Sequence, residues 1–191
     1  EAKSGYEMSL EGEVRQLKVI KILDKIHPID LIPTFCAQAI PPEWEGKTRE
    51  FAEVIADEWI PKFIEENLIE YCDVFAEIGF FGIEETRLIL EKCKELGKKI
   101  RIHADWLAES GGGRLGVELG VVSADHLIHT PMDVIDEIAK KGIIGVLLPT
   151  TPFCYLGRYA NAREIIRRGV PVALGTDLSA ANMSESMQMM M

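Results

Sequence analysis

The chain has 191 residues, of which 47% are hydrophobic, and this is enough to bury one sizeable core. No tract is long and apolar enough to span a bilayer, and the formal net charge of −10 argues against a groove for nucleic acid. The four cysteines are scattered and form no CxxC pair, so we expect reduced packing residues in a soluble, cytoplasmic protein.

Strand-type and helix-type runs alternate along the whole sequence. In chain order we expect strands at 1–4, 30–37, 72–78, 99–103, 121–125, 145–148 and 172–175, and helices at 11–25, 48–66, 84–96, 113–119, 132–140 and 160–168. About seven strands joined by crossover helices predict an α/β architecture with a parallel sheet. No linker or charge step interrupts the pattern, so we expect one domain over residues 1–191.

Polar residues at the strand ends distinguish two possible sheets. An open doubly wound sheet gathers its functional residues at one switch point, whereas a barrel gathers them around its mouth. Polar or reactive residues here follow nearly every predicted strand: Tyr6, Gln38, Glu77, His103, His126, Thr150 and Asp177. This ring favours a barrel, although one of the eight strands is lacking.

Three of these residues carry the chemistry that we expect. His103, His126 and Asp177 end the runs KIRIHAD, GVVSADH and PVALGTD, so two imidazoles and a carboxylate could share a metal ion or a substrate. Taken singly, each histidine could be a hydrogen-bonded structural residue, and Asp177 could cap the next segment. Their equivalent places in the repeat favour a shared site and metal-assisted hydrolysis.

A run of three glycines at 111–113 precedes a predicted helix, where it could cradle an anion. The run lies outside any GxxxxGK[ST] motif, so we do not expect a phosphate site there.

Seven short strings, taken in order, resemble the imidazolonepropionase family of the amidohydrolase superfamily. They are KSGY at 3–6, TF at 34–35, DVFAE at 73–77, RIHAD at 101–105, SADHL at 123–127, LLPTTPF at 147–153 and GTDLS at 175–179. The resemblance implies a (β/α)8 TIM barrel of the metal-dependent hydrolase type, represented here by roughly strands two to eight. We expect the small β-sandwich domain of the family to be absent from this chain.

The resemblance also implies an activity and roles for individual residues. The expected reaction is hydrolysis of the ring amide of imidazolone-5-propionate to N-formimino-L-glutamate, in histidine degradation, with one zinc or iron ion. His103 would be a metal ligand, and Asp177 would be both a ligand and a proton acceptor. His126 would polarise the substrate carbonyl or move protons, and Tyr6 would line the substrate pocket.

The sequence departs from the family pattern at four places. It has no HxH pair, which in the family supplies two metal ligands from the first barrel strand. Gln38 replaces a histidine, Trp106 replaces a glutamate, and Glu7 replaces a glycine. Tryptophan cannot accept or relay a proton, so Trp106 exchanges an acid/base group for an aromatic wall.

These departures leave a second interpretation open. The chain could be an amidohydrolase-family fragment or a redesigned barrel whose altered pocket lacks the native activity and binds or converts another small molecule. In that case Glu7 could act as a new base and Trp106 could stack on an aromatic substrate, or both could be tolerated loop residues. A seven-stranded sheet has two open edges, which predicts a homodimer or a complementary segment that closes it.

Overall fold

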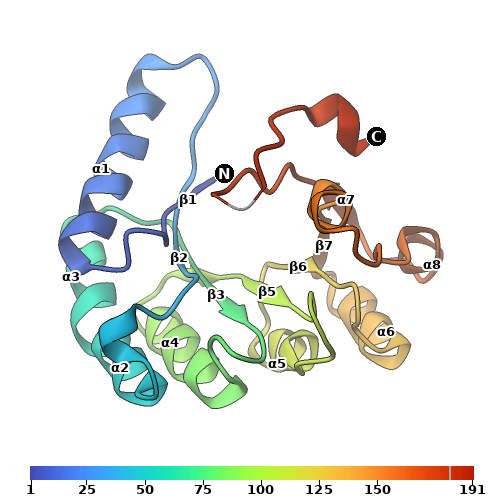
Figure 1. Cartoon of the computed structure of the whole chain (residues 1–191), viewed down its shortest axis with the longest axis horizontal. Helices are drawn as coiled ribbons and strands as arrows, with labels where there is room; N and C mark the ends of the chain where they lie inside the picture. Colours follow the sequence, from blue (N-terminus) through green and yellow to red (C-terminus); the bar gives the residue numbers. More distant parts are fainter. Residues whose placement is uncertain (181) are drawn as a thin grey trace. The chain divides into compact units, whose positions relative to one another are not determined.

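The computed structural model describes residues 1–180 and 182–191. The chain divides into two compact units, Glu1–Arg101 and Ile102–Met191, and each contains a parallel sheet with helices (Figure 1). We refer to them as the first and second units. The predicted alternation of strands and helices is confirmed in both units, while the expectation of a single domain stays a prediction.

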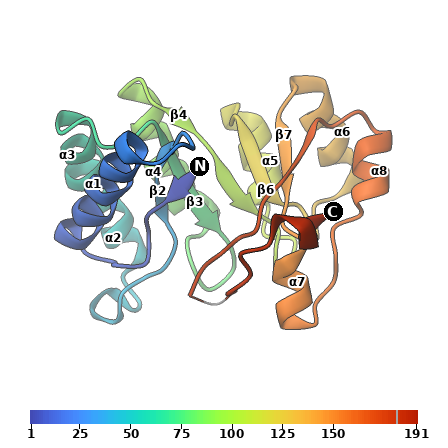
Figure 2. The ribbon, with the colours of Figure 1, turned by 90° about the horizontal axis from the view of Figure 1, so that it is seen from above.

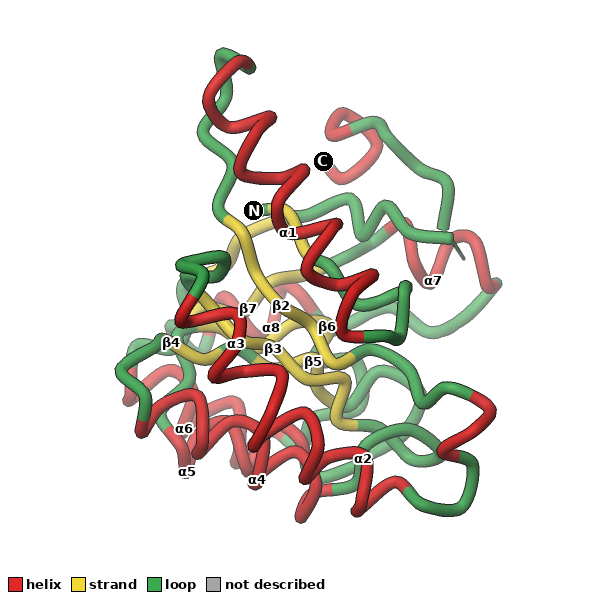
Figure 3. Tube along the Cα trace, turned by 90° about the vertical axis from the view of Figure 1, so that its left-hand side faces the viewer, coloured by secondary structure: helices red, strands yellow, loops and turns green. Residues whose placement is uncertain are grey.

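The first unit has four parallel strands in the order β1-β2-β3-β4. The strands are β1 (Ala2–Lys3), β2 (Pro33–Ala37), β3 (Tyr71–Ala76) and β4 (Lys99–Ile100). Helix α1 (Leu10–Ile26) packs against β2, and α4 (Ile83–Glu95) packs against β3 (Figure 3). All five residues of β2 are buried, as expected for a strand of a parallel sheet with both faces covered.

A long helical segment connects β2 to β3, after the short 3-10 helix η1 (Pro42–Trp44). It consists of α2 (Thr48–Val54), the π-helical turn η2 (Ile55–Trp59) and α3 (Ile60–Glu65), so the helix predicted at 48–66 is continuous but widened in its middle. Pro61 accounts for the widening, because proline has no N–H and its ring collides with the carbonyl four residues earlier. The π turn therefore ends at Trp59, two residues before the proline.

Aromatic side chains from this segment and the sheet form the core of the first unit. The rings of Phe35 and Phe63 lie 4.8 Å apart, and Phe51 contacts Trp59 at 5.4 Å and Phe81 at 6.1 Å. Such tilted, edge-on and stacked ring pairs add stability beyond the burial of apolar area.

A buried glutamate on α1 fixes the loop that carries Tyr6 and Glu7. The Glu13 carboxylate accepts hydrogen bonds from the backbone N–H groups of Glu7 and Met8, both at 3.0 Å. Burial raises the pKa of Glu13 above its ordinary value of 4.5. The hydrogen bonds lower the pKa, but the effect of burial is larger.

We expect Glu13→Gln to remove a pH-dependent loss of stability. Because the pKa of Glu13 is raised in the folded state, the native protein binds more protons than the unfolded chain just above pH 4.5, so stability falls as the pH rises through that window. The glutamine amide oxygen can still accept both N–H groups. Urea unfolding at a series of pH values should show the stability of the variant rising relative to the parent chain above pH 4.5; a constant difference would contradict this account.

The second unit has four parallel strands in the order β5-β6-β7-β8. Two of them, β6 and β7, are labelled in Figure 2. The strands are β5 (Ile102–Ala104), β6 (Ser123–His126), β7 (Ile144–Leu147) and β8 (Val172–Leu174). The helices are α5 (Gly112–Leu119), α6 (Met132–Lys141), α7 (Thr150–Tyr155), α8 (Ala162–Arg167) and the 3-10 helix η3 (Met187–Met190). In the part of the chain that the structure describes, no helix combines the length and apolar character needed to cross a membrane.

The structure differs from the sequence expectations at β4 and β5 and at α7. The strand predicted at 99–103 is divided into β4 and β5 at Arg101, whose guanidinium lies 4.3 Å from the centre of the Tyr71 ring. Helix α7 is not predicted from the sequence, because prolines at 149 and 152 are typical of a turn. Pro152 lies in the first turn of α7, where a backbone N–H has no partner within the helix, so proline is tolerated there.

Candidate metal centre

The ends of three strands in the second unit bring His103, His126 and Asp177 together. His103 lies in β5, His126 is the last residue of β6, and Asp177 follows β8. Their candidate ligand atoms, one from each side chain, all lie within 4.8 Å of one another. The shared location that the sequence pattern predicts is present, and the individual roles of the three residues stay predictions.

Both imidazoles are shielded from solvent. His103 is 6% exposed and His126 is 2% exposed, and their ring centres lie 5.3 Å apart. Asp177 is only half-buried. The centre therefore has a dry side formed by the imidazoles and a more open side formed by the carboxylate.

The backbone around the centre adopts an uncommon conformation. His126, Leu127 and Asp177 have φ values of 73°, 56° and 51°, in the left-handed region that side chains other than glycine rarely occupy. Each such residue costs about 1–3 kcal/mol, and these conformations concentrate at functional sites in proteins. Two of the three residues of the candidate centre, His126 and Asp177, thus adopt this conformation, which Met8, Asn67, Asp105 and Leu156 also adopt elsewhere in the described chain.

Two threonines at the start of α7 hold the segment that carries Asp177. The Thr151 hydroxyl donates a hydrogen bond to Oδ2 of Asp177. The Thr150 hydroxyl donates to the carbonyl oxygen of Thr176 at 2.6 Å. The sequence analysis noted Thr150 only as a strand-end residue and missed Thr151, although the LLPTTPF string that contains both was a clear signal.

Trp106 lies directly against the histidine pair. Its ring is stacked on the His126 imidazole, with centres 5.0 Å apart and planes within 8° of parallel. Tyr155 of α7 meets Trp106 edge-on at 5.7 Å. The aromatic wall expected from the sequence is therefore present beside His126, and a role in substrate binding stays a prediction.

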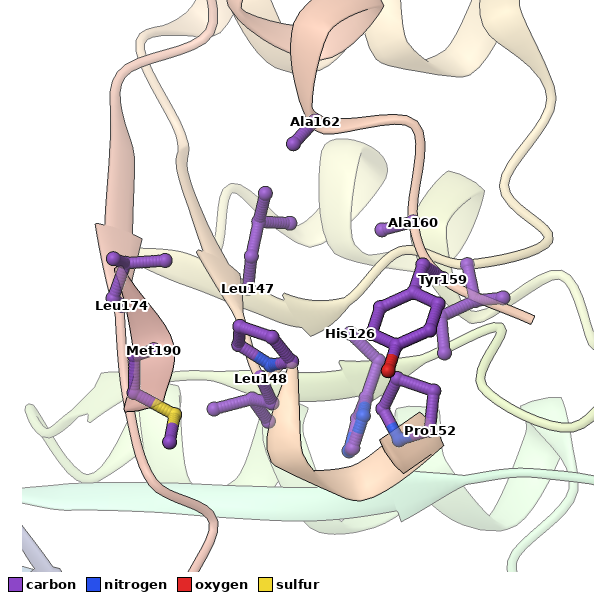
Figure 4. Close-up of a pocket in the computed structure, with 11 residues that line it drawn as sticks. His126, Leu147, Leu148, Pro152, Tyr159, Ala160, Ala162, Leu174 and Met190 are labelled. Carbon is purple, nitrogen blue, oxygen red and sulfur yellow. The ribbon is translucent and has the colours of Figure 1, made fainter. Parts of the chain in front are cut away.

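A small apolar cavity, bordered by His126, is lined mainly by residues of α7, the strands β7 and β8 and the segment before α8 (Figure 4). Its volume is about 140 Å³, and its lining includes Leu147, Leu148, Pro152 and Tyr159. Apart from the imidazole of His126 and the hydroxyl of Tyr159, the side chains that surround it are apolar. The imidazole of His126 thus borders both the candidate centre and an apolar space.

Asp105 is a structural residue that the sequence analysis missed. Its buried carboxylate accepts hydrogen bonds from the N–H groups of Ser110 and Gly111 at 3.0 Å and of Gly113 at 3.2 Å, and from the hydroxyls of Ser110 at 3.1 Å and Thr130 at 2.7 Å. A Cβ atom at Gly113 would lie 2.7 Å from this carboxylate. The glycine run therefore surrounds an anion, and that anion is the side chain of Asp105.

The other three predicted pocket residues lie in the first unit. Tyr6 is 45% exposed, and the Glu7 carboxylate forms an exposed ion pair with Arg15 at 2.8 Å. The amide oxygen of Gln38 accepts a hydrogen bond from the Cys36 thiol at 3.3 Å. Their roles in substrate binding stay predictions.

The donor set at the centre fits a divalent metal ion. Two imidazole nitrogens and a carboxylate oxygen are a common set of protein ligands in catalytic zinc sites. Iron(II) accepts the same combination of donors. The proximity of one atom from each side chain, within 4.8 Å, is compatible with a shared ion.

Comparison with known proteins identifies the relatives of this chain. It is 48% identical over 180 residues to imidazolonepropionase from Clostridium tetani, covering 94% of this chain and 43% of that protein. It is 42% identical over 194 residues to imidazolonepropionase from Alkaliphilus metalliredigens, covering 100% of this chain and 46% of that protein. This chain resembles part of an imidazolonepropionase. It spans less than half the length of these two relatives, and no family model matches it.

Solved structures show the same fold at much lower sequence identity. Guanine deaminase from C. acetobutylicum has a TM-score of 0.67 at 14% identity, with 94% of this chain and 46% of that chain covered. An amidohydrolase from Burkhoderia ambifaria, solved with bound zinc, has a TM-score of 0.65 at 14% identity, with 88% and 47% covered. The predicted α/β TIM-barrel fold is thereby confirmed for the part that this chain represents.

Proposed function

We propose that this imidazolonepropionase-like chain is part of a metal-dependent hydrolase of cyclic amides, with imidazolone-5-propionate as its substrate and N-formimino-L-glutamate as its product. The observation that carries the proposal is the convergence of His103, His126 and Asp177 at the ends of three strands. The similarity to imidazolonepropionases at 42–48% identity supports the choice of substrate.

In this proposal His103 and Asp177 hold one zinc or iron ion, with the imidazole of His126 beside them. A bound divalent cation supplies Lewis acidity, which lowers the pKa of water to about 7 and polarises a carbonyl group. His103 is well suited as a ligand because a neutral imidazole brings no charge into a buried place. The carboxylate of Asp177 balances part of the charge of the cation.

The remaining chemistry is a transfer of protons by this chain's own side chains. Asp177 takes a proton from the attacking water as the oxygen of that water bonds to the ring carbonyl carbon. His126 donates a hydrogen bond to the carbonyl oxygen, where negative charge develops. The carbon–nitrogen bond of the ring then breaks, and Asp177 returns the proton to the departing nitrogen.

The pocket residues position the substrate in this scheme. Trp106 presents an aromatic face beside His126, against which a planar ring can stack. Tyr6, Glu7 and Gln38 are further residues that we propose for substrate binding. We expect the protein to act on this small molecule in the cytoplasm.

Metal analysis combined with a hydrolysis assay tests the proposed function. We expect the purified chain to contain close to one zinc or iron ion and to convert imidazolone-5-propionate to N-formimino-L-glutamate, detected by mass spectrometry. Dialysis against a chelator should abolish the conversion, and adding the metal back should restore it. A metal-free protein without turnover would refute the proposal, and a metal-loaded protein without turnover would refute the proposed substrate.

A further inference from the structure

We propose that Thr151 is a positioning residue that holds the Asp177 carboxylate in the orientation required at the centre. The inference rests on the proposed function and assigns a role to a residue in α7 that touches neither metal nor substrate. Its basis is the hydrogen bond that the Thr151 hydroxyl donates to Oδ2 of Asp177.

The hydroxyl of Thr151 is a single, fixed donor. Thr151 is 1% exposed, and it lies in the first turn of α7, where helical backbone limits its side-chain rotamers. A hydroxyl has one proton, so it can engage only one of the two carboxylate oxygens. Oδ2 of Asp177 is thus held by the protein, and Oδ1 is the oxygen left for a cation or a proton.

The backbone before Asp177 is anchored by other groups. The Thr176 carbonyl accepts hydrogen bonds from the Thr150 hydroxyl at 2.6 Å and from the Asn182 amide at 3.0 Å. The N–H of Gly175 donates to the carbonyl of Leu147 at 3.2 Å. The chain path therefore does not depend on Thr151, and the distinct contribution of Thr151 is to the orientation of the carboxylate.

The orientation of the Asp177 carboxylate depends on such a restraint. It is half-buried, and its φ of 51° places it in a backbone region where its position depends on surrounding contacts. A carboxylate without a fixed donor can rotate about both of its side-chain bonds. Hydrogen-bond partners that orient metal ligands typically contribute 10–100-fold to metal affinity.

Three variants separate positioning from simple packing. Thr151→Val keeps the branched shape and removes the hydroxyl, whereas Thr151→Ser keeps the hydroxyl. Thr86→Val is the matched control, because Thr86 is a fully buried threonine of α4 in the first unit. Circular dichroism and thermal unfolding establish that each variant is folded before it is used.

Zinc affinity, measured by competition with a chromogenic chelator, is the first readout. We expect Thr151→Val to bind zinc about 10–100-fold more weakly than the parent chain, and Thr151→Ser and Thr86→Val to bind within about threefold of it. Equal affinity of Thr151→Val and the parent chain would overturn the inference. An equal loss in the valine and serine variants would also overturn it, because packing would then be the cause.

Crystal structures of the metal-free proteins provide a second readout that needs no metal binding. We expect one Asp177 rotamer in the parent chain and in Thr151→Ser, and a rotated or multiple rotamer in Thr151→Val. An unchanged rotamer in Thr151→Val would overturn the inference even if the parent chain binds zinc. If the parent chain binds no zinc, the proposed function fails, and the rotamers alone decide the role of Thr151.

Discussion

Asp177→Asn is expected to lower the hydrolysis of imidazolone-5-propionate by roughly a thousandfold and to weaken zinc binding. General acid–base groups contribute about 10²–10⁴-fold to rates, and Asp177 is the acid–base group of the proposed mechanism. Asparagine has nearly the same shape, and its amide oxygen can still accept the Thr151 hydroxyl. It has no negative charge to bind a cation and cannot take up a proton.

Steady-state kinetics and metal content measured on the same samples test this expectation. Asp133→Asn is the matched control, because Asp133 forms an exposed ion pair with Arg114 on the helical surface, at 2.9 Å. Removing such a pair changes stability by about 1 kcal/mol or less, so activity should stay within about twofold of the parent chain. Full activity in Asp177→Asn would show that another group moves the proton.

Asp105→Asn is expected to lower the free energy of unfolding by about 2–4 kcal/mol, the range for groups left unsatisfied in a buried, charge-assisted network. The carboxylate accepts five hydrogen bonds, four from the loop and the start of α5 and one from the Thr130 hydroxyl. Asparagine offers one oxygen in place of two and turns an NH₂ group toward N–H donors. The bonds to one carboxylate oxygen are thus lost, and their donors stay buried.

Urea unfolding followed by tryptophan fluorescence measures this effect. Trp106 directly follows Asp105 and stacks on His126, so its emission should also change in the native state. Asp57→Asn is the control, since Asp57 is an exposed partner of Lys92 on the helical surface. A loss in Asp105→Asn no larger than that in the control would contradict the structural role of this carboxylate.

The main strands and helices could be predicted because their side chains follow simple periodicities. Runs such as KIRIHAD and PVALGTD alternate with amphipathic helices, and the ends of parallel strands share one edge of a sheet. That rule alone was sufficient to group His103, His126 and Asp177. It works because strand direction fixes where the last residue of each run lies.

The elements that escaped prediction depend on contacts between segments. Helix α7 contains Pro152, and its formation depends on the position of that proline in the first turn. The role of Asp105 depends on Thr130, which lies 25 residues away in the sequence and supplies one of its donors. The ion pair of Glu7 depends on Arg15, which α1 places beside the loop. Local sequence patterns do not encode such pairings.

The central claim is that His103, His126 and Asp177 form one metal centre, and anomalous X-ray scattering at the zinc edge tests it most directly. Crystals of the chain grown with zinc should show an anomalous peak about 2.0–2.2 Å from a nitrogen of His103 and an oxygen of Asp177, with the His126 imidazole adjacent. The absence of a peak at these residues in a zinc-containing crystal, or a structure in which the three side chains lie apart, would contradict the account.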